Sequence, residues 1–78
     1  MDHELLELHN GSPIPLVVWV EPWGERLEIS PGSIWKMIDL RNPPSKPSIT
    51  ITQDGVAIYV LPEAELSILE GNCKVWQS

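Results

Sequence analysis

Apolar and polar residues alternate along most of the chain in short runs, and turn-forming residues separate one run from the next. The runs are rich in Ile, Val, Leu, Thr and Trp, which favour β-strands. Clusters that contain Pro, Gly and Asn interrupt them, and such clusters are typical of turns and loops. We therefore predict about seven or eight strands, close to residues 4–9, 14–21, 25–30, 33–41, 47–53, 56–61, 64–69 and 73–77.

These strands predict the fold class. Short strands at regular spacing with turns between them indicate an all-β sandwich or barrel, and we expect a small antiparallel one. The pattern does not separate the two architectures. Nor does it settle residues 3–9, where Leu5, Leu6 and Leu8 fit a strand or a turn of helix equally well. A chain of 78 residues forms one domain, here residues 1–78.

Two hairpins are predicted from turn residues. Residues 49–53 and 56–61 flank Asp54-Gly55, a pair that accepts the positive φ angles of a type I′ turn. In the first of these strands, the alternation predicts that Ile49 and Ile51 are buried and that the threonines between and after them face water. A second hairpin is expected across Pro31-Gly32, between residues 26–30 and 33–41.

Several predicted strands are apolar on both faces, which a single two-layer core does not explain. Successive side chains of a strand point to opposite faces, so residues 33–41 place Ile34, Ile38 and Leu40 on one face and Trp35 and Met37 on the other. The surplus apolar set could be covered by the chain itself, by a second copy, or by a ligand or partner on an open surface. This set comprises Val17, Trp19, Trp35, Met37 and Tyr59.

Composition favours the second copy. The chain has four Trp and no Phe, and an indole nitrogen needs a hydrogen-bond partner when it is buried, so Trp suits half-exposed positions. A domain of this size has a thin core that is often supported by a disulfide, a metal or a partner chain. Cys73 is the sole cysteine, so an intrachain disulfide is excluded. We therefore expect a homo-oligomer.

Charge narrows the range of partners. The net charge is −6, with eleven acids against five scattered bases, so the chain lacks the basic stripe that nucleic acid or an acidic membrane surface would need. The first residues resemble no secretory signal, and a lone thiol suits a reducing compartment. The sequence thus predicts a cytoplasmic protein that binds neither nucleic acid nor membrane.

Candidate chemistry is sparse. His3 and His9 lie about 20 Å apart on one extended strand, too far for one metal ion, so we expect no metal site and no cofactor. Cys73 is most simply interpreted as a small buried residue. Close carboxylates such as Glu25 and Glu28 are expected by chance among eleven acids. No catalytic residue is therefore assigned, and the pattern does not point to an enzyme.

The segment Val18-Trp19-Val20-Glu21-Pro22-Trp23-Gly24-Glu25, followed by Leu27 to Ser33 with Pro31-Gly32, resembles short uncharacterised bacterial β proteins that carry E-P-W-G and a later P-G turn. The P-G element is also similar to a turn of cupin barrels, but the paired histidines that hold a cupin metal are absent. The resemblance implies a β fold and transfers no activity. It covers about a fifth of the chain.

Within this segment, Pro22 can fix φ at the first turn position and Gly24 can accept a positive φ. Trp23 then projects from the turn, where it either caps one end of the fold or touches a ligand.

The leading functional hypothesis is a non-catalytic, homo-oligomeric binding or accessory module, with Trp19, Trp35, Met37, Tyr59 and Trp23 as candidate binding or interface residues. The alternative is a cupin-like module that stacks a small ligand, for example a sugar, on Trp19, Trp35 or Tyr59. An enzyme with a site at a subunit boundary is the third.

Overall fold

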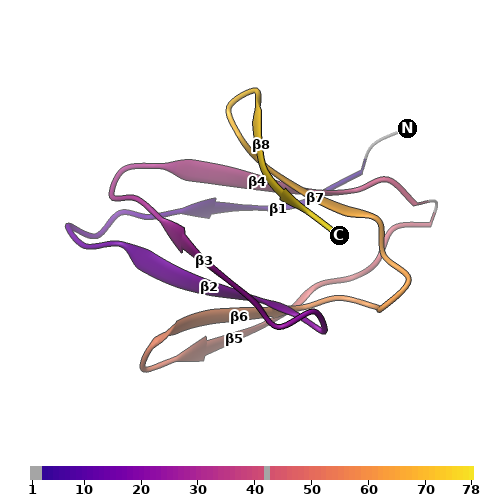
Figure 1. The fold of residues 1–78 in the computed structure, drawn as a ribbon, viewed down its shortest axis with the longest axis horizontal. Coiled ribbons are helices and arrows are strands. Elements are labelled where there is room, and N and C mark those ends of the chain that lie inside the picture. Colours follow the sequence, from indigo (N-terminus) through magenta and orange to yellow (C-terminus); the bar gives the residue numbers. More distant parts are fainter. Residues whose placement is uncertain (1–2, 42) are drawn as a thin grey trace.

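The computed structural model describes residues 3–41 and 43–78, apart from the side chain of His3. The described part of the chain forms eight β-strands in two stacked four-stranded sheets (Figure 1). We call the sheet with strand order β1-β4-β7-β8 sheet A and the sheet with order β3-β2-β6-β5 sheet B. The strands are β1 (His3–His9), β2 (Leu16–Glu21), β3 (Glu25–Ile29), β4 (Ile34–Asp39), β5 (Ser48–Thr52), β6 (Gly55–Tyr59), β7 (Leu66–Glu70) and β8 (Cys73–Gln77).

The predicted all-β fold is confirmed, and it is a sandwich rather than a closed barrel. Residues 3–9 form strand β1, which settles the ambiguous segment. Neighbouring strands pair antiparallel with one exception, because β2 and β6 run parallel and place Trp19 beside Ala57. The pairing of β2 with β6 brings together two halves of the chain that no short turn connects.

A contact between the sheets fixes which edges lie over one another. Trp76 of β8 donates its indole N–H to Glu25 of β3, with 2.9 Å between Nε1 and Oε1. The Trp76 ring also meets the ring of Trp23 edge-on, at 5.5 Å between centroids. Strand β8 therefore lies over β3, and from the strand orders β1 and β5 lie at the opposite edge of the sandwich.

The core lies between the inner faces of the two sheets. Val18, Val20 and Ile58 of sheet B are fully buried there. Side chains this well buried stabilise the fold by removing apolar surface from water. Sheet A contributes Trp35, Met37, Leu66 and Ile68, and Ile29, Val60 and Ala64 complete the cluster.

The expected faces of residues 33–41 are reversed in strand β4. Trp35 and Met37, placed in the surplus apolar set, point into the core with 5% and 1% of their surface exposed. Ile34 and Leu40 face outward, 44% and 45% exposed. Both faces of this strand carry large apolar residues, so alternation alone does not identify the inner one. The indole of Trp35 is satisfied by Glu70, at 2.8 Å between Nε1 and Oε1.

Burial of Ile49 and Ile51 was also expected, and this is wrong. Ile49 pairs with buried Ile58, and cross-strand partners share a face, so the isoleucines do point to the inner side. They nevertheless remain 48% and 82% exposed. The reason is that β5 is the last strand of sheet B and sheet A does not cover it.

The β5–β6 hairpin exists, but its turn differs from the predicted type I′. The register pairs Thr52 with Gly55, so the turn residues are Gln53 and Asp54. No described residue other than glycine has a positive φ, whereas type I′ requires it at both central positions. The Thr52 hydroxyl stabilises the turn instead, since it accepts the N–H groups of Asp54 and Gly55 at 3.2 Å.

Pro31-Gly32 forms a turn between sheets, not the predicted hairpin, because β3 belongs to sheet B and β4 to sheet A. Buried Asn10 stabilises this passage of the chain from sheet B to sheet A. Its side-chain amide donates to the carbonyl oxygens of Ile29 and Ile14 at 2.8 and 2.9 Å. Its backbone carbonyl accepts the N–H of Gly32 at 2.8 Å. One side chain thus joins the loop after β1 to the end of β3.

Candidate binding face

The outer face of sheet B carries two aromatic residues that lie outside the core, Trp19 and Tyr59. The registers of β2 with β3, β6 and β5 place its side chains in rows across the four strands. The middle row comprises Arg26, Trp19, Ala57 and Thr50. The row on one side contains Glu28, Val17, Gly55 and Thr52, and the row on the other contains Glu21, Tyr59 and Ser48.

Trp19 and Tyr59 form the aromatic part of this face. Trp19 pairs with Ala57 and Glu21 pairs with Tyr59, so the two aromatic residues are diagonal neighbours on adjacent strands. Diagonal Cα atoms in a sheet are about 7–8 Å apart, which lets two rings contact one flat ligand. Trp19 is half-buried and Tyr59 is 48% exposed.

Small residues on β6 keep the space beside Trp19 free of bulky side chains. Ala57 lies next to Trp19, and Gly55 lies against β2 so closely that an added Cβ would stand 2.2 Å from the carbonyl oxygen of Val17. Real Cβ atoms do not approach that closely, so the backbone geometry admits only glycine at this position. Trp19 therefore has small neighbours on β6, and Ala57 is almost completely covered, with 8% of its surface exposed.

Polar side chains border the aromatic pair on both sides. Arg26 is ion-paired with Glu28, at 3.0 Å between Nη1 and Oε2. Tyr59 lies between Glu21 of β2 and Ser48 of β5. The border therefore offers carboxylate oxygens and hydroxyl groups, while its single cation is already paired.

The polar ends of the two aromatic residues are available to a ligand. Among the described residues, neither the indole N–H of Trp19 nor the hydroxyl of Tyr59 forms a hydrogen bond within the chain. By contrast, Trp35 and Trp76 each donate to a glutamate. Two of the four tryptophans thus donate to a carboxylate. Trp19 and Trp23 have no such partner among the described residues.

Of the five candidate residues, the structure brings Trp19 and Tyr59 together on one outer face. Trp35 and Met37 lie in the core, so neither belongs to the outer face of sheet B. Trp23 lies at the turn after β2, where Gly24 has the expected positive φ of 70°. Its ring packs against Trp76 and is 37% exposed, which matches the capping role rather than a place on the outer face.

The border residues Arg26, Glu21 and Ser48 were not singled out from the sequence. Their positions beside Trp19 and Tyr59 depend on which strands are neighbours. In particular, no turn or motif in the sequence predicts the parallel pairing of β2 with β6. The alternation of Arg26 and Glu28 with Leu27 and Ile29 is the local signal that the sequence offers, since both of these charged residues are exposed.

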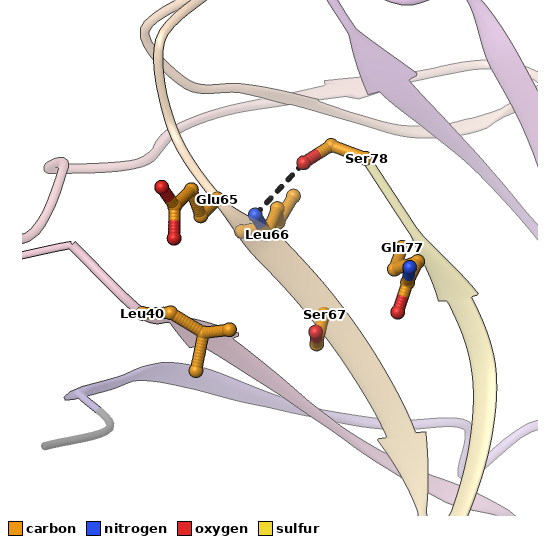
Figure 2. A pocket seen from close by; sticks show the side chains of 6 residues that line it. All are labelled: Leu40, Glu65, Leu66, Ser67, Gln77 and Ser78. Atoms are coloured by element: carbon orange, nitrogen blue, oxygen red, sulfur yellow. Dashed lines mark hydrogen bonds between the residues drawn. The ribbon is translucent and has the colours of Figure 1, made fainter.

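A separate hollow of about 250 Å³ lies at the end of sheet A beside the C-terminal residues (Figure 2). Two residues of its lining are joined by a hydrogen bond, in which the Leu66 N–H donates to the Ser78 hydroxyl at 3.0 Å. Glu65 is the one ionisable residue in its lining, so it holds no pair of groups for acid–base chemistry. The lining comprises Leu40, Glu65, Leu66, Ser67, Gln77 and Ser78.

Groups that could act in catalysis are dispersed in the described part of the chain. No cluster of three His, Cys, Asp or Glu residues there could hold a metal ion. His9 interacts with Glu7 at 3.1 Å, and the buried carboxylate of Asp39 accepts backbone N–H groups. Cys73, expected to be buried, is exposed, because β8 is an edge strand and the residue lies at its start.

Among the described residues, no helix is long and apolar enough to cross a membrane. Comparisons with protein-family models, with curated proteins and with solved structures find no match. The resemblance to short bacterial β proteins and to a cupin turn therefore stays a prediction.

Proposed function

We propose that the chain is a non-catalytic binding module whose outer face on sheet B binds a neutral, polyhydroxylated ring, in chemical terms a sugar. The observation that carries the proposal is the pair Trp19 and Tyr59, diagonal neighbours on one face of sheet B whose polar ends form no hydrogen bond with any described residue. Aromatic rings at such positions give large, rigid contact area at low entropic cost.

Chemistry at the border selects the ligand class. A phosphorylated or otherwise anionic ligand is disfavoured, because Arg26 is already paired with Glu28 and the chain carries a net charge of −6. A purely apolar ligand would bind better in a concave pocket, and this face is open. A sugar ring has an apolar side for the aromatic rings and hydroxyl groups that can donate to Glu21 and Glu28.

The affinity should be modest. Stacking of a planar ring on one aromatic side chain contributes about 1–3 kcal/mol in nucleic-acid complexes. Two such rings contribute about 2–6 kcal/mol before the cost of immobilising the ligand is subtracted, so we expect a Kd of about 1 mM or weaker.

The test is a titration of tryptophan fluorescence with maltose, cellobiose and N-acetylglucosamine. We expect a saturable change with at least one sugar, and a tenfold or greater loss of affinity in Trp19→Ala and in Tyr59→Ala. Trp23→Ala is the matched control, because it removes an exposed indole from the turn and should bind as the wild type does. Circular dichroism would check that each variant folds.

Two results would contradict the proposal: no response of the wild type to any sugar, or an equal loss of affinity in Trp23→Ala. A response to inorganic phosphate but to no sugar would also overturn the assigned ligand class.

A further inference from the structure

The two sheets end in four edge strands, and three of them carry features that prevent pairing with another chain. Edge strands expose free N–H and C=O groups, and natural proteins protect them with charged residues and β-bulges. Strand β1 carries Glu4 and Glu7 and has a register shift after Glu4. Strand β8 carries Lys74 and pairs with β7 through a shift after Ile68, and β3 carries Glu25, Arg26 and Glu28.

Strand β5, with the sequence Ser-Ile-Thr-Ile-Thr, lacks both kinds of protection. It has no charged residue, and its register with β6 runs from Ser48 to Thr52 without a shift. All five of its residues are exposed. A regular, uncharged edge of this kind is a template for a further strand.

The side chains of β5 add an apolar contact to this open edge. Ile51 is the most exposed large apolar residue of the described chain at 82%, and Ile49 is 48% exposed. Both lie on the inner side, while Ser48, Thr50 and Thr52 share the outer side. One face of the strand is thus apolar and the other hydroxylic, so a matching strand must have the same alternation.

We propose that β5 pairs antiparallel with β5 of a second copy, about a two-fold axis at Thr50. Such an isologous contact uses the same surface on both copies. Thr50 then faces its own counterpart, and Ile49 of each copy faces Ile51 of the other. The isoleucines meet on the inner side and the hydroxyls on the outer side, which joins the two copies of sheet B into one sheet of eight strands.

Charge favours contact through β5 over other ways in which two copies could associate. Each copy carries a net charge of −6, so contact between acidic parts of the two surfaces is repulsive. Contact through β5 places no charged side chain of one edge strand against the other. This proposal does not rest on sugar binding, because it is argued from the uncharged edge of β5 and from Ile49 and Ile51, which point away from the outer face.

The size of the contact predicts a reversible dimer. Five residues of strand span about 16 Å, so the buried area falls below the roughly 800 Å² per partner of a standard interface. We therefore expect a monomer–dimer equilibrium that shifts over a hundredfold range of protein concentration.

The experiment measures mass in solution for the wild type, Thr50→Lys and Thr50→Glu, by size exclusion with light scattering. Wild type should move from 8.8 kDa towards twice that mass as concentration rises. Each Thr50 variant should dimerise at least tenfold more weakly, because like charges directly opposite in a sheet repel. An equimolar mixture of the two variants should regain dimers, since Lys then faces Glu across the axis.

Ser30→Lys is the matched control, with a new charge on an exposed residue at the opposite edge of sheet B, and should dimerise like the wild type. The proposal is overturned if the wild type is monomeric at every concentration, or if the mixture stays as monomeric as its components. Should a Thr50 variant not fold, hydrogen exchange of the wild-type β5 amides at low and high concentration decides. Slower exchange at high concentration supports the dimer, and an unchanged rate contradicts it.

Discussion

At the scale of single residues, the buried carboxylate of Asp39 is the clearest structural device. It has no exposed surface, and it accepts backbone N–H groups from Ser45 at 2.7 Å, Arg41 at 2.9 Å and Glu65 at 3.3 Å. These bonds anchor the proline-rich loop after β4 and the start of β7 to one point. A charge buried in this way is tolerated because its oxygens have donors.

Asp39 should make stability depend on pH. Burial by itself raises its pKa, but the N–H groups of Ser45, Arg41 and Glu65 outweigh it and hold the pKa below the ordinary value of 3.8. A carboxyl group with a lowered pKa in the folded state contributes stability above its ordinary pKa, and this contribution is lost as pH falls through the folded pKa. We expect Asp39→Asn to cost about 1.5–3 kcal/mol at pH 7.

Urea unfolding at pH 7 and at pH 2 measures this effect as the difference between wild type and Asp39→Asn. The difference should shrink at the lower pH, and an equal difference at both values would contradict the role of the charge. Asp54→Asn, which changes an exposed turn carboxylate, should alter the free energy of unfolding by less than about 0.5 kcal/mol at either pH.

At the scale of elements, Gly55 links the β5–β6 hairpin to β2. Its φ of 151° and the contact that a Cβ would make with the Val17 carbonyl oxygen both exclude a side chain. Because that obstacle is backbone in the centre of sheet B, the neighbour cannot move aside without loss of the β2–β6 pairing.

Gly55→Ala should therefore destabilise the fold by about 2 kcal/mol or more, as strained backbone and displaced packing do. Gly11→Ala is the control, since nothing lies within 4 Å of its added Cβ, and it should change stability little. Chemical denaturation of the two variants provides the comparison. Equal stabilities would show that β2 and β6 tolerate separation at this point.

The elements also show what the sequence can predict. Local alternation and turn residues placed the strands within a few residues, except that they left residues 3–9 open between a strand and a turn of helix. The inner face of β4 was assigned wrongly, since Ile34 and Trp35 are both large and apolar and burial is decided by the opposing sheet. Of the binding face, Trp19 and Tyr59 were named, but the position of Arg26 depends on pairing between distant segments.

At the scale of the whole molecule, the interior is confined to the space between the two sheets. Met37, 1% exposed, and Ile34, 44% exposed, lie on opposite faces of the same strand. Met37→Ala should cost about 2–5 kcal/mol, as large-to-small changes in a core do, whereas Ile34→Ala should cost less than about 1 kcal/mol. Thermal unfolding followed by circular dichroism measures both. Similar losses would mean that the outer side of β4 is covered in solution.

The two proposals combine at this scale. Pairing through β5 would place two copies of the Trp19 and Tyr59 face on the same side of one continuous sheet. A ligand with several sugar rings could then bind both faces, and linked binding raises apparent affinity without any new contact.

The parallel pairing of β2 with β6 has a consequence for how the chain acquires its structure. Residue 19 meets residue 57, residue 8 meets residue 35 and residue 39 meets residue 66, so half of the strand pairings cannot begin as local hairpins. Chains dominated by such distant pairings fold in milliseconds to seconds, because loop closure precedes the stabilising contacts. During synthesis, β2 and β3 can pair only with each other, as a two-stranded ribbon, until β6 has left the ribosome.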